Sequence, residues 1–339
     1  MRNESKKKRV RKAIRVNVIE NVRRGMTSVD TVIWGCYNSN DMVIAEGVLE
    51  IGDKKEGVCM KKVLVTGASG YIGRHIVNQL IKDKCEVLVS DLVLDCFSDN
   101  QVKKITEPIF SGDKDIFHKM GEPDVCLHLA WQDGFKHNSH AHIGNLSAHY
   151  EFINNMLAGG LKQIAVMGTM HEIGYWEGKV DETTPTNPMS NYGIAKNALR
   201  EATRELCKEY GAVYQWLRAY YITGDDMKNH SIFAKIIEKE QAGEKEFPFT
   251  SGKNKYDFLD IDELAYQIAT TIQQSEVDGI INCCSGVPIS LAEKVESFLK
   301  ENNYNIKLKY GAFPDREYDS PAIWGDDQKI KKIIARREK

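Results

Sequence analysis

Short apolar runs alternate with amphipathic stretches along most of this chain. Residues 63–65, 87–89, 124–130 and 161–167 have the composition of buried strands. Apolar positions between these runs recur at helical spacing, as they do in residues 76–81. Strands that alternate with helices form parallel sheets. The pattern therefore predicts an α/β fold with a doubly wound parallel sheet, which binds ligands beyond the carboxyl ends of its strands.

The second half of the chain continues in the same style beyond Gly224. The predicted elements there are a helix over 232–241, a short strand near Phe247, a helix over 262–273, a strand over 280–284, a helix over 291–299, a strand over 306–310 and a basic last helix. These elements are enough for a second, smaller lobe beside the main sheet.

A glycine-rich turn joins the first strand to the first helix. Its glycines are Gly67, Gly70 and Gly73, and Tyr71 and Ile72 open the helix. In such a turn the first glycine permits the tight bend, the second lets the backbone approach a pyrophosphate, and the third lets helix pack on strand. The helix N-terminus then offers free N–H groups to the anion. The turn predicts a dinucleotide site, with an ordinary glycine-rich turn as the alternative.

Later strand ends supply further candidate contacts to a dinucleotide. Asp91 follows the second strand at the spacing where a carboxylate accepts hydrogen bonds from the adenosine ribose. A carboxylate there repels a 2′-phosphate and no arginine follows it, so NAD(H) is favoured over NADP(H). Asp113 is either an adenine contact or an ordinary loop residue. Leu129 and the small Ala130 end a buried strand where a cofactor lies against the backbone.

Composition restricts the class of protein. The 339 residues contain 46 basic and 48 acidic side chains, which argues against nucleic-acid or membrane binding by the chain as a whole. No apolar run approaches the roughly 18 residues that cross a bilayer, so we expect a soluble, cytoplasmic protein. The cysteines form no CxxC pair and are interpreted as reduced thiols, without a zinc or disulfide role: Cys36, Cys59, Cys85, Cys96, Cys126, Cys207, Cys283 and Cys284.

Residues 1–59 form a strongly basic extension, with most of the charge in residues 6–24. Three interpretations are open: a solvated disordered tail, a segment that binds nucleic acid or anionic lipid, or a mis-assigned start. The third interpretation arises because Met60 directly precedes the first strand. In addition, residues 55–57 could be encoded by a purine-rich ribosome-binding sequence.

Histidines are concentrated between His128 and His149, with His137, His140 and His142 among them. Their spacing matches no HExxH or paired-ligand template, and no cysteine cluster accompanies them, so no metal site is predicted. We expect polar loop and helix surface here, with contact between one histidine and substrate as the alternative.

Candidate catalytic residues lie around the strand over 161–167. Thr169 stands at its carboxyl end, and Tyr192 and Lys196 lie four residues apart on one face of a later helix. A phenol has a pKa near ~10, and a neighbouring ammonium group favours the phenolate. Lys196 is placed to provide that charge and to hold the nicotinamide ribose. Thr169 would bind the substrate oxygen while Tyr192 transfers a proton and the nicotinamide exchanges hydride.

Taken together, these motifs resemble the extended short-chain dehydrogenase/reductase superfamily, in particular its NAD-dependent sugar-nucleotide epimerase/dehydratase group. The resemblance runs from Met60 almost to the C-terminus. The motifs that carry it are GxxGxxG at Gly67, Gly70 and Gly73, the HLA strand at 128–130, Thr169, and the Tyr192/Lys196 pair.

The resemblance implies a domain organisation. A NAD-binding Rossmann domain would span 60–225, and a substrate-binding lobe would span 226–339, with segments within about 256–285 returning to the main sheet. It also implies a nucleotide-sugar substrate and a homodimer.

Departures from the family pattern narrow the reaction. Sugar-nucleotide dehydratases carry Asp and Glu directly after the active-site Thr, whereas this chain has Met170 and His171, so dehydration is not expected. Tyr221 replaces the Asn that contacts substrate in the family. The leading Arg of a later family segment is missing, and Lys255 or Arg316 would then contact a substrate diphosphate, unless each is only a surface charge.

The sequence therefore predicts an NAD-dependent oxidoreductase that acts at C4 of a nucleotide-linked sugar or deoxysugar, with a 4-keto reductase as the first interpretation. A 4-epimerase with the same residues is the nearest alternative. A non-catalytic Rossmann protein that senses dinucleotide is the third, although such a protein would not need Thr169, Tyr192 and Lys196 together.

Overall fold

The computed structural model describes residues 32–38, 41–47, 61–224, 231–315 and 319–338. The chain divides into two compact units, Met1–Cys59 and Met60–Lys339. In the first unit, strands β1 (Val32–Asn38) and β2 (Asp41–Gly47) pair antiparallel. Its basic residues 6–24 lie outside the described residues. The sequence pattern did not predict the two strands.

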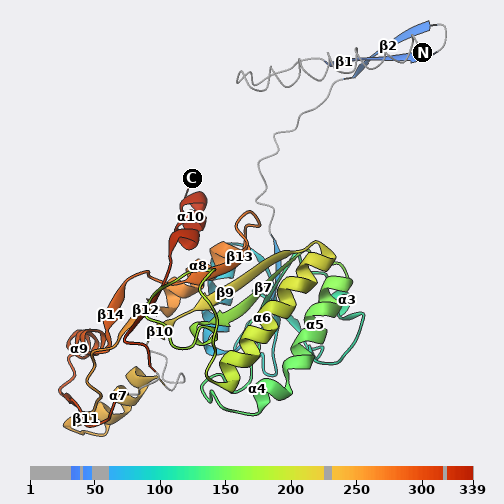
Figure 1. Cartoon of the computed structure of the whole chain (residues 1–339). Helices are drawn as coiled ribbons and strands as arrows, with labels where there is room; N and C mark the ends of the chain where they lie inside the picture. Colours follow the sequence, from blue (N-terminus) through green and yellow to red (C-terminus); the bar gives the residue numbers. More distant parts are fainter. Residues whose placement is uncertain (1–31, 39–40, 48–60, 225–230, 316–318, 339) are drawn as a thin grey trace. The chain divides into compact units, whose positions relative to one another are not determined.

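A parallel sheet of seven strands forms the centre of the second unit (Figure 1). Its order is β13-β9-β7-β6-β3-β4-β5, and every neighbouring pair is parallel. The strands are β3 (Lys62–Thr66), β4 (Glu86–Ser90), β5 (Lys103–Ile105), β6 (Val125–His128), β7 (Gln163–Thr169), β9 (Val213–Ala219) and β13 (Gly279–Cys283). The prediction of a doubly wound α/β fold is confirmed.

Helices cover both faces of this sheet. The helices on one face are α2 (Tyr71–Lys82), α8 (Ile261–Ile272) and α10 (Gln328–Arg337). The helices on the other face are α3 (Ile116–Lys119), α5 (Leu146–Ala158) and α6 (Asn191–Tyr210), and α4 (Ala141–Gly144) precedes α5 (Figure 1). Each face has its own apolar cluster, and Leu64 and Val65 point into different clusters because adjacent strand residues alternate sides. This alternation explains why the strands are apolar throughout.

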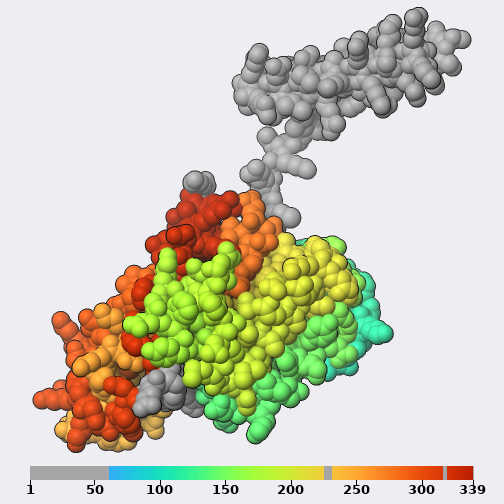
Figure 2. Space-filling model, in the orientation of Figure 1, coloured from blue at the N-terminus to red at the C-terminus, as the bar shows by residue number. Residues whose placement is uncertain are grey.

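A smaller lobe is built around a second sheet. Its path is β10 (Tyr221–Thr223), β12 (Lys255–Asp260), β16 (Ala322–Gly325) and β8 (Gly178–Val180), and β14 (Pro288–Ser290) also pairs with β12. The rest of the lobe consists of α7 (Ile232–Gln241), α9 (Leu291–Glu301), β11 (Glu246–Pro248) and β15 (Lys307–Lys309). In Figure 2 the C-terminal residues, in orange and red, gather beside the yellow-green surface of the chain that follows β7.

The order of segments along the chain does not follow the division between the main sheet and the lobe sheet. Strands β8 and β10 precede residue 225 yet belong to the lobe sheet, whereas α8 and β13 follow it and pack in the main unit. The buried Asp257 on β12 joins them, because its carboxylate accepts hydrogen bonds from the N–H groups of Ser285, Gly286 and Gly325. Within the described ranges, no helix combines the length and the apolar character that a membrane crossing requires.

Candidate active site

The glycine turn is shaped by close backbone contacts. Gly67 has a φ of +68°, and a Cβ there would lie 2.6 Å from the Ala130 nitrogen. A Cβ on Gly73 would lie 2.4 Å from the Gly67 oxygen, so these two glycines are required by packing within the protein. At Gly70 the nearest such contact is 3.2 Å, which leaves the surface of the turn open to a ligand. Tyr71 opens α2 directly behind it.

Asp91 lies beside this turn. Its Oδ2 atom accepts hydrogen bonds from the Ser69 backbone N–H at 2.9 Å and from the Ser69 hydroxyl at 2.7 Å. Its Oδ1 atom accepts one from the Leu92 N–H at 2.7 Å. The carboxylate therefore connects the end of β4 to the glycine turn, at the place expected for a ribose ligand. Ser69 was not among the predicted site residues.

Three other predicted cofactor contacts, Asp113, Leu129 and Ala130, differ in their surroundings. Asp113 forms an ion pair with Lys119, at 2.5 Å, and accepts a hydrogen bond from its own loop at the Asp115 N–H. Leu129 and Ala130 run against β3, where Thr66 accepts hydrogen bonds from both of their N–H groups. Ala130 thus faces the glycine turn, whereas the Asp113 carboxylate is engaged with its neighbours.

Thr169, Tyr192 and Lys196 come together at the carboxyl end of β7. Ser190 caps α6 by accepting a hydrogen bond from the Gly193 N–H, so Tyr192 and Lys196 lie in the first two turns of the helix. The Thr169 side chain lies beside Tyr192, where hydrogen bonding to the phenol oxygen lowers the pKa of Tyr192. The Lys196 ammonium donates to the Met167 carbonyl oxygen, at 2.8 Å.

Burial sets the protonation of these groups. Loss of water raises the pKa of Tyr192 to about 12, and within the described part of the chain the Thr169 hydrogen bond is what opposes this rise. Burial lowers the pKa of Lys196 to about 7, and the nearby Glu172 carboxylate opposes that change. The phenol is therefore protonated at neutral pH.

Glu172 is a site residue that the sequence analysis missed. It is completely buried, and its Oε1 atom accepts hydrogen bonds from the Thr169 N–H at 2.7 Å and from the Trp216 indole N–H at 2.8 Å. The short helix η1 (Met170–Glu172) is closed by a capping box between Thr169 and Glu172. The sequence T-x-x-E was the signal that could have revealed it.

The histidine-rich segment is mostly interior. The expectation of loop and helix surface was wrong for His142 and His149, whereas His128 lies in a strand that was predicted to be buried. His128, His142 and His149 are at most 2% exposed, because ring contacts and hydrogen bonds satisfy them inside the fold. His140 is exposed as expected. The His137 ring stacks on Tyr192, with 5.4 Å between their centroids.

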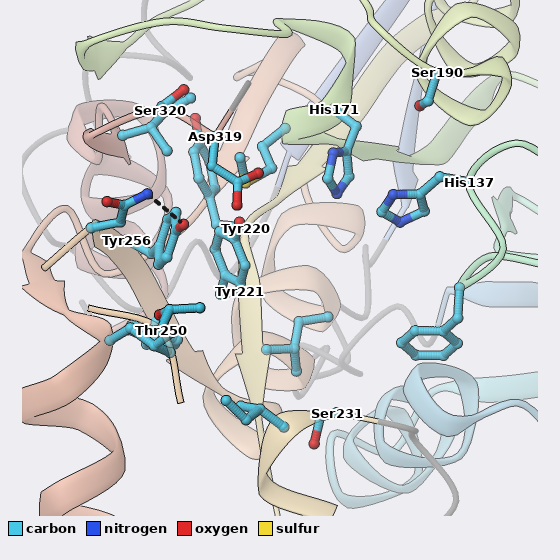
Figure 3. Close-up of a pocket in the computed structure, with 18 of the residues that line it drawn as sticks. His137, His171, Ser190, Tyr220, Tyr221, Ser231, Thr250, Tyr256, Asp319 and Ser320 are labelled. Carbon is cyan, nitrogen blue, oxygen red and sulfur yellow. Dashed lines mark hydrogen bonds between the residues drawn. The ribbon is translucent and has the colours of Figure 1, made fainter. Parts of the chain in front are cut away.

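A cavity of about 920 Å³ lies between the glycine turn and the lobe (Figure 3). Its lining includes Tyr71 and Ile72 at the start of α2, His137 and His171 beside Tyr192, and Tyr221 in the lobe. In Figure 3 the two imidazoles point toward each other at one end of the cavity. Their centroids are 4.3 Å apart.

Of the three predicted substrate contacts, one lines the cavity, one does not, and one lies outside the described residues. Tyr221 lines the cavity, and its ring centroid lies 4.3 Å from that of Tyr256. Lys255 is exposed on β12 and does not line this cavity. Arg316 lies outside the described residues. Met170 and His171, which stand where dehydratases carry carboxylates, both face the cavity, and burial lowers the pKa of His171 to about 4.

A doubly wound parallel sheet, a glycine turn opening α2, and a Thr–Tyr–Lys set beside a cavity define an enzyme of the extended short-chain dehydrogenase/reductase type. The model of the NAD dependent epimerase/dehydratase family matches residues 63–284. The chain belongs to this family, and the predicted resemblance is confirmed.

Relatives within the family are named for reactions at C4 of nucleotide sugars. The dTDP-6-deoxy-L-talose 4-dehydrogenase (NAD(+)) of Aggregatibacter actinomycetemcomitans is 44% identical over 272 residues, which cover 78% of this chain and 98% of that protein. Two solved structures share the fold. The UDP-N-acetylglucosamine 4-epimerase of Methanobrevibacter ruminantium has a TM-score of 0.70 at 22% identity, covering 80% of this chain and 91% of that one. The Thermus thermophilus UDP-glucose 4-epimerase complex with NAD has a TM-score of 0.68 at 19% identity, covering 82% and 93%.

Proposed function

We propose that this protein is an NAD-dependent 4-keto reductase of a nucleotide-linked deoxysugar. The observation that carries the proposal is that Tyr192 lies beside Thr169 and contacts His137 and His171, which line the cavity, with Lys196 on the same face of α6. The name of the 44%-identical relative supports the same chemistry, because oxidation and reduction at C4 are two directions of one reaction.

Tyr192 and Thr169 act on the C4 carbonyl oxygen of the substrate, and Lys196 acts on Tyr192. The Tyr192 hydroxyl gives its proton to the C4 oxygen, and Thr169 donates a hydrogen bond to the same atom. Bound NADH supplies the hydride that C4 accepts. Since the pKa of Tyr192 is raised to about 12, the resting phenol carries the proton that reduction consumes. Lys196, charged below its pKa of about 7, stabilises the phenolate that remains.

The cofactor proposed is NAD(H) rather than NADP(H). The turn has room for a pyrophosphate at Gly70. A Cβ at Gly70 would meet fewer protein atoms than one at Gly67 or Gly73, so this surface is open to a ligand, and the N-terminus of α2 follows it directly. Asp91 presents a carboxylate beside this turn. A 2′-phosphate would be repelled by that charge, whereas ribose hydroxyls would donate hydrogen bonds to it.

The substrate proposed is a nucleoside diphosphosugar whose pyranose lies near His171 and Tyr221. Both side chains line the cavity, and the His171 imidazole is neutral at neutral pH because its pKa is lowered to about 4. A neutral imidazole accepts one hydrogen bond and donates another, which suits sugar hydroxyls. Contact of Lys255 or Arg316 with the diphosphate stays a prediction, as does the homodimer.

The test follows NADH absorbance with the purified full chain. With dTDP-6-deoxy-L-talose and NAD⁺, we expect NADH to form in proportion to the 4-keto sugar, and to be consumed in the reverse direction. Interconversion of C4 epimers without net change in NADH would instead establish the epimerase. Binding of NADH without turnover of any nucleotide sugar in a uridine, thymidine, guanosine and cytidine panel would support the non-catalytic alternative.

Replacement of Tyr192 by Phe gives the matched control. The variant keeps the ring and its contact with His137 but loses the proton, so we expect turnover to fall by roughly 100-fold or more with NADH affinity nearly unchanged. A variant with undiminished turnover would rule out this catalytic role.

A further inference from the structure

Trp131, which lies within the histidine-rich segment, contacts the proposed catalytic residue Lys196. The Lys196 Nζ atom lies 3.9 Å from the centroid of the Trp131 ring. Trp131 follows the exit of β6, and its ring also contacts Tyr192, at 6.1 Å between centroids. A cation this close to an indole face is attracted by the electron density of the ring.

Histidines hold the indole in this position. The Trp131 Nε1–H donates to the Nδ1 atom of His142, at 3.0 Å, and the His142 Nε2 atom lies 3.0 Å from the Lys136 carbonyl oxygen. These partners require His142 to be neutral, with its proton on Nε2. The ring of His149 stacks on that of Trp131, with 4.5 Å between the two ring centroids.

The network continues to the end of β3. His149 and His128 share a hydrogen bond of 2.9 Å, and the His128 Nδ1 atom lies 2.8 Å from the Thr66 hydroxyl oxygen. Burial lowers the pKa of His149 to about 3 and that of His128 well below its usual value, so both rings are neutral. The imidazoles therefore add rigidity around Lys196 without adding a competing positive charge.

We propose that Trp131 is a positioning residue whose ring face holds the Lys196 ammonium in place and in its charged form, with His142 and His149 fixing the ring. The proposal rests on the proposed function only in giving Lys196 a part in catalysis.

The titratable groups that face Lys196 define the expected pH response. They are Glu172 from η1, His128 from β6 and His149 from α5, and Tyr192 lies one turn away on α6 itself. Burial lowers the pKa of Lys196 to about 7, and Glu172 raises it. An indole face attracts the ammonium and not the neutral amine, so removal of the ring lowers this pKa further. Reduction requires the ammonium, and its rate therefore falls as pH rises through the Lys196 pKa.

The test compares Trp131→Leu with Trp131→Phe in the full chain. We expect Trp131→Leu to move the alkaline fall of kcat to lower pH by about 0.5–1 unit, and Trp131→Phe to move it by less, since Phe keeps a weaker ring face. Phe117→Leu is the matched control, because it also removes an aromatic ring from this side of the sheet. Its pH profile should superimpose on that of the wild type.

A second readout separates this proposal from the reaction itself. NADH affinity, measured by fluorescence of the bound nucleotide, should depend on the charge of Lys196 and show the same displacement in Trp131→Leu, even if no sugar is reduced. If both Trp131 variants bind NADH more weakly but with the pH dependence of the wild type, the ring has only a structural role and the proposal is overturned. If Trp131→Leu does not fold, the Phe variant alone decides.

Discussion

At the scale of single residues, Glu172 is the buried charge on which the site depends. Its carboxylate accepts the Thr169 N–H with one oxygen and faces two guanidinium groups with the other, Arg218 at 3.4 Å and Arg200 at 3.7 Å. Removal of this buried charge is costly, because the buried Arg218 loses its carboxylate partner, whereas Arg200 keeps its ion pair with Glu201. Glu172 therefore fixes both the backbone of Thr169 and the charge balance below it.

Replacement of Glu172 by Gln should destabilise the fold. The amide retains an oxygen for Thr169 but presents its NH₂ group to the arginines, so we expect a loss of about 2–4 kcal/mol in the free energy of unfolding. Urea titration measures this directly. Glu177→Gln makes the same chemical change at an exposed position and should stay within about 0.5 kcal/mol of the wild type. Equal stabilities for the two variants would contradict this account.

What could be predicted at this scale depended on spacing along the chain. Tyr192 and Lys196 were found because helical periodicity places them on one face, and Thr169 because it ends a strand. Trp131 was not found, because its contact with Lys196 joins the ends of β6 and α6 and no local pattern encodes it. The buried histidines were misjudged because polarity predicts exposure only when hydrogen-bond partners are lacking.

At the scale of elements, the glycines of the turn between β3 and α2 have different roles. A Cβ on Gly73 would collide with the Gly67 oxygen at 2.4 Å and the Ala68 oxygen at 2.5 Å, whereas a Cβ on Gly70 meets only the Gly67 oxygen, at 3.2 Å. Gly70 also has φ −64° and ψ 169°, which any residue adopts. Gly73 serves the packing of α2 on β3, and Gly70 is left for the ligand.

This division predicts opposite phenotypes for two alanine substitutions. Gly73→Ala should lower the free energy of unfolding by about 2–3 kcal/mol, because α2 must move away from the turn. Gly70→Ala should change stability by less than about 1 kcal/mol, yet weaken NADH roughly tenfold or more, because its methyl group stands where the pyrophosphate approaches. Thermal unfolding without cofactor and NADH titration make the comparison.

The converse result would be equally clear. If Gly70→Ala bound NADH as tightly as the wild type, the turn would not carry the pyrophosphate, and the assignment of the cofactor site would fail.

The lobe shows where element-level prediction stopped. Helices α7 and α9 and the short strands β11 and β15 were predicted, but the strands of the lobe sheet itself, β8, β10, β12, β14 and β16, were not. Strand β8 is three residues long and pairs with β16, far away in sequence, so its place depends on tertiary contacts alone. Asp257 links the sheets through backbone N–H groups, which carry no sequence signature.

At the scale of the whole molecule, all described residues of the proposed site lie in the unit Met60–Lys339. The family match begins at residue 63, and the 44%-identical relative aligns over 98% of its own length with 78% of this chain. The basic residues of the first unit have no assigned part in the chemistry. We therefore expect catalysis to be independent of residues 1–59.

A variant without residues 1–59 tests this expectation. Its kcat/KM for the nucleotide sugar and its NADH affinity should both remain within about twofold of the full chain, because neither the glycine turn nor the cavity lining is altered. The same pair of proteins, titrated with duplex DNA at increasing salt, separates a nucleic-acid role of the basic residues from catalysis. Binding confined to the full chain and weakening with salt would support that role. A marked loss of kcat/KM in the shortened protein would instead show that the first unit contributes to the active site.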